Sequence, residues 1–566
     1  MLAAIASWIE VVVVSKSLRH MLTVVVMVVA AVFSFAIAPG AARAADTGAI
    51  TVDGTVATRY DAYQLFSATV IDDVDADQKV ATDITWANDA VRQAVLPVLH
   101  DAGLDGSAST AQEAAEWMNA DGHMTTALTA KLARVIVKAD AEPVALNAGT
   151  AAELPCGYWL IVADDDAIAQ DEAGTAPIMA LVGGSAVTVK PKAATPKVAK
   201  HVLEDSAAAW GKAADATVAD DLYWRLSATV PAGLTAYDTY AVQFVDTMSA
   251  GLDPSKVAAS MHVYVAAGAE GGFDAVSTGK DGRAGTKPAK GWADITAQCV
   301  TKVAADGTFT VRTGDLIAAL GGVDAFTMGA RVVAVYDAPL ASGCNHGIAK
   351  GNPNEVYLRY PRSPFADQSG DAGFTHTPSD DATAYTWGLS LIKRSSSDDK
   401  PLAGVKLSIT DDRGRTLAAD GTWTTDVDAC VVSGEDGRVE LSGVDAGVYT
   451  VEEVAAPKGY TAFEGTRSVT VKAEGLDVDQ VAAAKPKLTI TAESPLRADS
   501  ADGSTGSLEA SLINTPTGTP PSTITGGFMP STGDMAMFAA AAAAVAGAAI
   551  LVVALLIKRG GGHHTE

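Results

Sequence analysis

The chain contains an uninterrupted apolar run from Met535 to Ile557, followed at once by Lys558 and Arg559. A transmembrane helix needs about 20 consecutive apolar residues, so this run is long enough to cross a bilayer. Basic residues after a span favour the cytoplasmic side, which puts the short tail inside the cell. The pattern therefore predicts a single-pass anchor, with the residues before Met535 folded outside the membrane.

The other end of the chain has the pattern of an export signal. Basic residues precede an apolar run from Met21 to Ala38, and Pro39 with Gly40 breaks that run. The segment Ala42-Arg43-Ala44 then provides the small-x-small pattern that signal peptidase needs. We expect a signal peptide over residues 1–45, and a membrane anchor at this end is the alternative.

Charge and motif content exclude several classes of function. The formal net charge is -26, and binding to nucleic acid needs a basic surface. Such a charge suits a soluble, self-repelling surface protein. The cysteines and histidines lack metal-ligand spacing, and no catalytic constellation emerges. We therefore expect no nucleic acid partner, no metal and no cofactor, and an anchored enzyme is the least favoured interpretation.

Linkers divide the rest of the chain. Segments 190–196, 365–384 and 515–527 are rich in Pro, Thr, Gly or Asp, as interdomain joints are. The expected units are a signal peptide (1–45), a first domain (46–192), a middle domain (193–364), a third domain (365–514), a stalk (515–528) and a C-terminal signal (529–566).

Hydrophobic periodicity sets the fold class of each unit. Helical spacing over 85–99, 110–118 and 125–137, beside strand patterns, predicts an α+β first domain. Thr110 with Glu113 has the spacing of a capping box. Short alternating runs separated by turn residues predict two β-sandwiches for the middle and third domains. The expected fold is mainly β, with tandem immunoglobulin-like sandwiches after an α+β domain and a C-terminal transmembrane helix.

The pentapeptide Met529-Pro530-Ser531-Thr532-Gly533 precedes the apolar run. With that run and its basic tail it resembles a sortase sorting signal, usually Leu-Pro-x-Thr-Gly. Methionine is apolar and of similar length to leucine, so a pocket for that side chain could accept it. The resemblance implies cleavage between Thr532 and Gly533 and transfer of the Thr532 acyl group to an amine. A plain membrane anchor is the alternative.

Three residues of the third domain form a further pattern. Lys393 ends an alternating strand, Glu453 lies in the segment Tyr449–Tyr460, and Asn514 ends the strand-like run 508–514. The segment resembles the glutamate box of a collagen-adhesin B-type domain, Tyr-x-Leu-x-Glu-x-x-Ala-Pro-x-Gly-Tyr, with valine in the Leu place. The resemblance implies an isopeptide bond between Lys393 and Asn514, with Glu453 as the acid/base. Ordinary surface side chains are the alternative.

Burial would make that bond chemically accessible. It lowers the pKa of a lysine and raises that of a glutamic acid, so a neutral pair can exist at pH 7. The carboxyl group can then assist as ammonia leaves, and the fold supplies proximity. Because the turnover is single, this is self-processing and not an enzyme activity. The bond would close a long loop, as a disulfide does.

The middle domain resembles that of isopeptide-forming fimbrial subunits, on segments 223–231, 237–252 and 351–358. The resemblance implies a reacting lysine at Lys200 and an assisting acid at Asp246. Arg362 stands where the asparagine is expected, so we expect no bond here. Asn352 or Asn354 could substitute, but an offset of one or two residues is expected to point the side chain elsewhere. A Lys200–Asp246 salt bridge is the alternative.

The first linker holds a candidate polymerisation residue. The segment Val187–Lys192 resembles the pilin motif Val-Tyr-Pro-Lys, with Lys190 in the Tyr place. The resemblance implies that Lys192 accepts the acyl group of another subunit. Lys190 and Lys197 are competing positions, and solvated linker lysines are the alternative.

Four cysteines complete the set of candidate sites. Export permits disulfides. Cys299 and Cys344 share a domain and could pair, whereas Cys156 and Cys430 lie in different domains and are expected to be thiols.

Taken together, the chain resembles a backbone pilin of Gram-positive bacteria. The resemblance implies a structural, cell-wall-anchored surface protein without enzyme activity. Its partners would be a pilin sortase, a housekeeping sortase, other copies of itself, peptidoglycan and a host surface ligand. The alternative is a monomeric adhesin or an accessory pilin, which would share every anchor feature.

Overall fold

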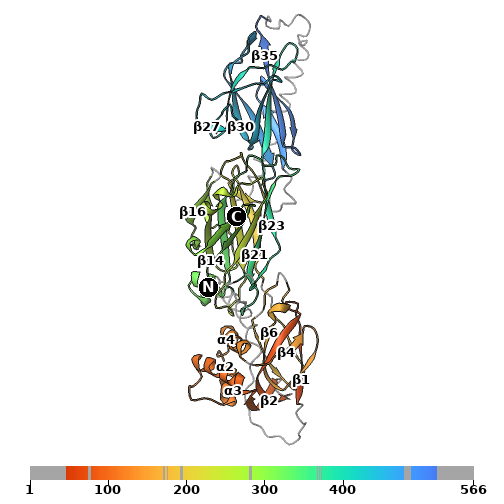
Figure 1. Cartoon of the computed structure of the whole chain (residues 1–566), viewed down its shortest axis with the longest axis vertical. Coiled ribbons are helices and arrows are strands. Elements are labelled where there is room, and N and C mark those ends of the chain that lie inside the picture. The colour runs from red at the N-terminus through yellow and green to blue at the C-terminus, as the bar shows by residue number, and fades with distance from the viewer. Residues whose placement is uncertain are drawn as a thin grey trace, which may run out of the picture.

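The computed structural model describes residues 46–518 with short gaps. The gaps are residues 74–77, 140, 170–171, 175, 192–194, 280–282, 366–367, 369, 371 and 477–485. Figure 1 shows three bodies stacked along one long axis, with the first domain at the bottom. Strands dominate all three, and helices of eight or more residues occur only in the first, within the described residues. The predicted mainly β fold with an α+β first domain is confirmed.

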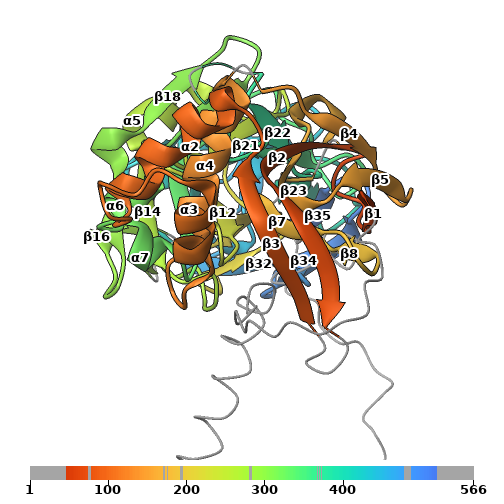
Figure 2. The ribbon, with the colours of Figure 1, turned by 90° about the horizontal axis from the view of Figure 1, so that it is seen from below.

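The first domain combines two sheets with three helices. Its helices are α2 (Asp89–Asp101), α3 (Ala111–Asn119), α4 (Thr126–Lys138) and the 3-10 helix η1 (Asp165–Ala167). Its strands are β1 (Thr47–Val52), β2 (Arg59–Asp73), β3 (Gln78–Trp86), β4 (Val144–Asn147), β5 (Ala152–Pro155), β6 (Gly157–Ala163), β7 (Ile178–Val182) and β8 (Val187–Val189). Figure 2 shows the helices gathered on one side of β2 and β3.

These elements form three layers. A five-stranded sheet, in the order β3-β2-β6-β7 with β4 beside β2, lies between the helices and a three-stranded sheet, β5-β1-β8. Leu160 of β6 packs in the core on the helical side, and its neighbour Ile161 packs in the core shared with β1. Every residue of β6 is buried, as a strand covered on both faces requires.

Helix starts follow from local capping. Thr110 accepts a hydrogen bond from the Glu113 amide, and Glu113 accepts one from the Thr110 amide, so the predicted capping box is confirmed. The helix predicted from residue 85 begins instead at Asp89. Residues 85 and 86 stay in β3, paired with β2, and the Asn88 side chain caps the helix by accepting from the amide of Val91 at 2.9 Å.

The middle domain is a sandwich of two sheets. Its strands are β9 (Lys197–Glu204), β10 (Ala209–Gly211), β11 (Ala213–Asp215), β12 (Tyr223–Val230), β13 (Gln243–Met248), β14 (His262–Ala267), β15 (Val276–Thr278), β16 (Ala284–Pro288), β17 (Ala293–Asp294), β18 (Val300–Val303), β19 (Thr308–Arg312), β20 (Ala330–Asp337), β21 (Asn352–Pro361), β22 (Phe374–His376) and β23 (Asp380–Tyr385). Its short helices are η2 (Pro254–Lys256), α5 (Val257–Ser260), η3 (Thr296–Gln298), α6 (Leu316–Ala319) and α7 (Val323–Phe326).

One sheet has the order β10-β9-β12-β20-β14-β17 and the other β11-β23-β21-β13-β19-β18, with β22 beside β21. The core between them includes Trp224, Phe244 and Tyr336, all fully buried. Strands β22 and β23 pair with β21 of the middle domain, although we expected the third domain to begin at residue 365. The chain instead leaves the sheet of the middle domain after β23 and passes through Thr386 into the first strand of the third domain.

The third domain is a second sandwich. Its strands are β24 (Trp387–Ser395), β25 (Lys406–Thr410), β26 (Thr416–Leu417), β27 (Trp423–Thr424), β28 (Val431–Val432), β29 (Arg438–Val444), β30 (Gly447–Ala455), β31 (Tyr460–Thr461), β32 (Thr466–Glu474), β33 (Lys487–Ala492), β34 (Leu496–Asp502) and β35 (Ser507–Pro516). Strands β29-β24-β35-β31 form one sheet with β34, and β27-β26-β25-β30-β32-β33 form the other with β28. The first and last strands, β24 and β35, are parallel neighbours.

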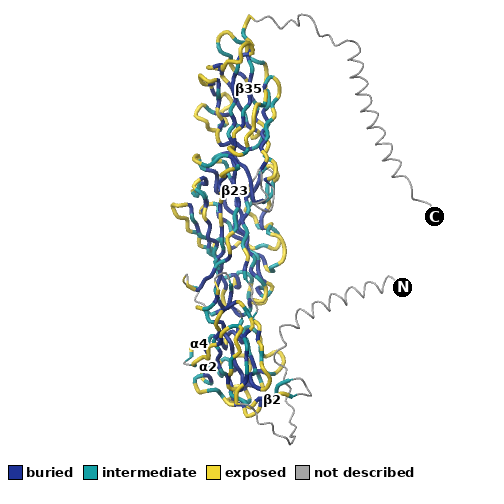
Figure 3. The backbone as a smooth tube through the Cα atoms, turned by 90° about the vertical axis from the view of Figure 1, so that its right-hand side faces the viewer, coloured by how far each residue is buried: buried dark blue, intermediate teal, exposed yellow. Residues whose placement is uncertain are grey.

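Figure 3 shows buried residues continuing along the axis of the molecule, including the region where the middle and third domains meet. At that joint the Asp215 carboxylate accepts hydrogen bonds from the Trp387 indole at 2.5 Å and from the Ala446 amide at 2.8 Å. Arg415 of the third domain pairs with Asp220 of the middle domain. The two domains are therefore held by more than the single residue that connects their strands.

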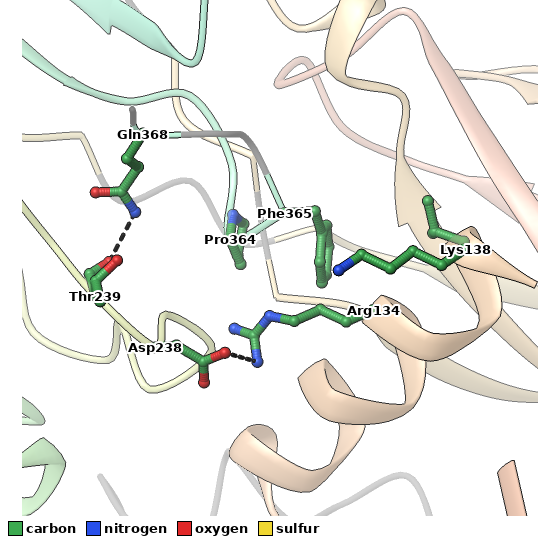
Figure 4. Close-up of a pocket in the computed structure, with 8 residues that line it drawn as sticks. Arg134, Lys138, Asp238, Thr239, Pro364, Phe365 and Gln368 are labelled. Atoms are coloured by element: carbon green, nitrogen blue, oxygen red, sulfur yellow. Dashed lines mark hydrogen bonds and ion pairs between the residues drawn. The ribbon is translucent and has the colours of Figure 1, made fainter. Parts of the chain in front are cut away.

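The first and middle domains also contact each other through hydrogen bonds and packed side chains. The Gly174 amide donates to the carbonyl of Arg362 at 2.6 Å, and Phe365 packs against the helical core of the first domain. Figure 4 shows the pocket of about 250 Å³ at this joint, where Arg134 of α4 pairs with Asp238 and Gln368 donates to Thr239.

Candidate functional site

Lys393, Glu453 and Asn514 meet in the interior of the third domain. The Lys393 amine lies 2.8 Å from one carboxylate oxygen of Glu453, and the Asn514 amide nitrogen donates to the other oxygen at 2.5 Å. All three side chains are buried. A single carboxyl group therefore contacts both an amine and a carboxamide, away from bulk water.

Strand alternation brings these side chains together. In β24 and β35 the inward positions alternate with outward ones, and Lys393 and Asn514 take inward positions among Leu391 and Leu512. Lys393 pairs with Leu512 in the parallel register, so Asn514 lies one inward position further along. Glu453 approaches from β30 of the opposite sheet.

Burial changes the charge state of this lysine. Loss of water contact lowers the pKa of Lys393 to about 8, although its contact with Glu453 acts in the opposite direction. The Phe463 amide donates to Glu453 at 3.3 Å, and the Phe463 ring centre lies 5.5 Å from the amine. The side-chain carbonyl oxygen of Asn514 is buried and has no hydrogen-bond partner among the described residues. A lysine with this pKa loses its proton readily near neutral pH.

A second buried cluster occupies the middle domain. Lys200 of β9 forms a salt bridge with Asp246 of β13 and donates to the Tyr336 hydroxyl of β20 at 2.9 Å. That hydroxyl donates to Asp246 at 3.0 Å and accepts from the amide nitrogen of Asn354, on β21, at 2.9 Å. The four side chains are fully buried and come from both sheets.

Desolvation dominates the electrostatics here as well. It lowers the pKa of Lys200 to about 8 and raises the pKa of Asp246, even though each charge would favour the other. Burial also raises the pKa of Tyr336 well above its usual value, so the phenol stays protonated. The site can hold a neutral amine beside a neutral acid, as amide exchange chemistry requires.

The asparagine of this cluster is not where we expected it. Arg362, the residue at the expected position, extends to the first domain and donates to the carbonyl of Asp165 at 3.2 Å. Asn354 joins the cluster instead, through its hydrogen bond to the Tyr336 hydroxyl that Lys200 and Asp246 also contact. We expected an offset of one or two residues to point the side chain elsewhere, but Asn354 lies eight residues before Arg362 and faces inward, because alternate residues of a strand share a face. Asn352 also faces inward, but it accepts from the Asn345 amide at 2.8 Å.

The candidate disulfide is not formed. Cys299 and Cys344 are free thiols in the structure, as is Cys430, and Cys156 is buried. Strand pairing places Cys299 level with the start of β13, on the far side of β19, whereas Cys344 lies close to Gly251, beyond the end of β13. A six-residue strand spans roughly 20 Å, and a disulfide needs Cα atoms within about 7 Å.

Other predicted site residues lie at or beyond the limits of the described chain. Lys192, the sorting pentapeptide 529–533 and the signal peptide are outside the described residues. Of the competing lysines, Lys190 is 75% exposed and lies 3.4 Å from Asp53, and Lys197 is the exposed first residue of β9. In the part of the chain that the structure describes, no helix has the length and hydrophobicity to cross a membrane; the predicted span, 535–557, lies outside that part.

One family model and several solved structures are similar to this chain. Residues 388–485 match the family described as the SpaA prealbumin-like fold domain. A comparison with curated protein sequences gives no match. Among solved structures the chain is similar to the T6 backbone pilin of serotype M6 Streptococcus pyogenes, at 14% identity and a TM-score of 0.46, over 84% of this chain and 99% of that one.

Two further similar structures come from Corynebacterium diphtheriae. The full-length major pilin SpaD is 13% identical with a TM-score of 0.40, over 84% of this chain and 98% of that one. The major pilin SpaA is 15% identical with a TM-score of 0.37, over 83% of this chain and 100% of that one. The structure of SpaA is described as pointing to a modular pilus assembly with stabilising isopeptide bonds.

Proposed function

We propose that this chain is the backbone subunit of a covalent surface pilus, whose sandwich domains crosslink themselves by isopeptide bonds. The observation that carries the proposal is the contact of Glu453 with both Lys393 and Asn514. It joins the first and last strands of one domain through the groups that amide bond formation requires. The match of this domain to the SpaA prealbumin-like family supports the same reading.

The proposed reaction in the third domain exchanges one amide for another. Lys393 passes a proton to Glu453, and its neutral amine attacks the side-chain carbonyl carbon of Asn514. The new carbon–nitrogen bond forms, Glu453 gives its proton to the departing nitrogen, and the old carbon–nitrogen bond of Asn514 breaks to release ammonia. The lysine nitrogen then gives its second proton to Glu453, which passes it to the ammonia, so the product leaves as ammonium. The carboxyl group is regenerated and neither oxidant nor cofactor is consumed. Burial and fixed proximity replace the encounter of two free molecules.

The same exchange is proposed for the middle domain. Lys200 would attack Asn354 with Asp246 as the acid/base, forming one amide bond and releasing one ammonia. The salt bridge between Lys200 and Asp246 provides the starting proton transfer, because burial disfavours both charges. This assignment replaces the expectation that the middle domain is uncrosslinked.

Assembly would use the two sequence signals outside the described residues. A pilin sortase would cleave between Thr532 and Gly533 and join Thr532 to Lys192 of another copy. A housekeeping sortase would attach the finished polymer to peptidoglycan. In this proposal the chain is exported, its precursor is held by the span 535–557, and the pilus supports adhesion to a host ligand. The chain would have no enzyme activity beyond its own single-turnover crosslinking.

An immunoblot of cell-wall extracts, boiled in detergent and reductant, tests the polymer. We expect a high-mass ladder from wild type that collapses to a single band in Lys192→Ala. Lys190→Ala is the matched control, because it removes a neighbouring linker lysine, and it should keep the ladder. A ladder lost only in the control would move the acceptor to Lys190. A single band from wild type would reject the pilus and favour a monomeric adhesin.

A further inference from the structure

The hydroxyl group of Tyr336 is the common contact of the middle-domain cluster. It accepts a hydrogen bond from Lys200 at 2.9 Å and another from Asn354 at 2.9 Å, and it donates to Asp246 at 3.0 Å. Both reacting nitrogen atoms therefore touch the same phenol. No motif in the sequence indicated Tyr336 as a site residue.

The two crosslinking clusters differ in how the acid reaches the carboxamide. In the third domain Glu453 contacts the lysine and the asparagine directly. In the middle domain the acid is an aspartate, whose side chain is one methylene shorter. Asp246 binds Lys200, and the tyrosine hydroxyl bridges Asp246 to Asn354. Burial raises the pKa of Asp246, and a side-chain hydrogen bond from Asn354 is among the smaller effects that lower it.

We propose that the Tyr336 hydroxyl is the proton relay of the middle-domain crosslinking reaction. This inference rests on the proposed bond between Lys200 and Asn354. It adds a catalytic group to that reaction, and it gives a role to the one hydroxyl that contacts the acid and both nitrogen atoms.

The relay follows from the changing character of the asparagine nitrogen. Before attack this nitrogen belongs to a planar amide and can only donate, which is how it meets the hydroxyl in the structure. After Lys200 has attacked, the nitrogen is a tetrahedral amine with a lone pair. The Tyr336 hydroxyl can then turn, give its proton to the nitrogen and take one from protonated Asp246. Ammonia leaves, the phenol is restored, and no proton is gained or lost by the relay.

The surroundings keep the phenol ready for this role. Burial holds it in the protonated form, which both donates and accepts. Its ring packs edge-to-face on Phe309 at 4.9 Å between ring centres. That ring contact does not involve the hydroxyl, so the ring and the hydroxyl can be tested separately.

Tyr336→Phe removes the hydroxyl and keeps the ring. Tyr237→Phe is a matched control, since Tyr237 is buried in the same core and its hydroxyl has no hydrogen-bond partner among the described residues. The chain is expressed without its signal peptide, unfolded before crosslinking is complete, and refolded. Peptide mass spectrometry then follows the loss of one ammonia from each domain with time. We expect Tyr336→Phe to slow the middle-domain bond about 100-fold, with the control and the third-domain bond unchanged.

A second substitution protects the test against a folding defect. Replacing Tyr336 with a difluorotyrosine keeps the hydroxyl but makes it more acidic. If the hydroxyl carries a proton, the dependence of the middle-domain rate on pH should shift, whereas a purely structural hydroxyl would leave it unchanged.

The outcomes separate the two proposals. If wild type never loses ammonia from the middle domain, the Lys200–Asn354 bond itself is rejected. If wild type forms the bond and both Tyr336 variants form it with the same rate and pH profile, only the relay is rejected. A slowed Tyr336→Phe reaction together with a shifted difluorotyrosine profile supports the relay.

Discussion

Lys393 and Asn514 lie at opposite ends of the sequence of the third domain, yet they occupy neighbouring parallel strands and contact the same carboxyl group. A bond between them would close a loop on the order of 100 residues, for which a crosslink is worth up to about 5 kcal/mol of unfolding free energy. The contribution of this bond to the unfolding free energy of the third domain can therefore be measured by preventing its formation.

Glu453→Ala should prevent the third-domain bond and lower its stability. After allowance for the mass of the substitution, the protein should retain the one ammonia that crosslinked wild type loses. Thermal unfolding should shift to lower temperature by an amount consistent with several kcal/mol. Glu452→Ala is the matched control, since Glu452 is exposed on the same strand. Intact mass and calorimetry together check this prediction, and a crosslinked Glu453→Ala protein would contradict it.

The middle domain offers a choice between two residues. Asn354→Ala should abolish the loss of ammonia from this domain, because it removes the carbon that Lys200 attacks. Arg362→Ala should have no effect on that bond, because Arg362 contacts the first domain. Mass spectrometry of peptides joined through Lys200 decides between them. A bond that survives Asn354→Ala would place the partner elsewhere.

The free lysine should leave a signature in the dependence of stability on pH. In Asn354→Ala the Lys200 amine stays buried, with a pKa lowered from 10.5 to about 8. The unfolded chain therefore binds more protons than the folded chain between pH 8 and 10.5, so stability should rise with pH in this window. The raised pKa of Asp246 acts in the opposite sense at lower pH. Urea unfolding of the variant and of crosslinked wild type measures the difference, and equal slopes would contradict the assignment.

The joint between the middle and third domains should weaken as pH rises. Burial, with the nearby Asp215, raises the pKa of Glu204 to about 8 from 4.5. A raised carboxyl pKa means that stability is complete below pH 4.5 and is lost as pH increases toward 8. Glu204→Gln should flatten this dependence, and Glu435→Gln, at an exposed turn, should not. Unfolding free energies measured across this range check the slopes.

Linear motifs explain which parts of the site the sequence could predict. Glu453 stands in a continuous segment of recognisable spacing, and Lys393 and Asn514 end strands with clear alternation. The complete set of residues in the buried cluster of the middle domain was harder to predict from the sequence, because these residues come from four separate strands. Tyr336 lies in an ordinary alternating strand, and nothing in its neighbours marks the hydroxyl; only the pairing of β20 between β12 and β14 places it at the core.

The expected start of the third domain at residue 365 was too early, and the reason lies in the composition of the segment that follows. Residues 365–384 are rich in small and polar side chains, which made them a linker by composition. This segment nevertheless contains β22 and all but the last residue of β23, and both strands pair with β21. Composition alone does not distinguish a linker from a short strand that forms by pairing with a strand elsewhere in the sequence.

The direct passage from β23 through Thr386 into β24 determines how tension would travel along the molecule. A pull on both ends enters the third domain at the start of β24 and leaves at the end of β35. Once Lys393 and Asn514 are joined, the load would cross from one strand to the other at that amide and bypass residues 394–513. The same shortcut from Lys200 to Asn354 would spare most of the middle domain. Force along the molecule would then pass mainly through covalent bonds, and most of each sandwich would not be under tension.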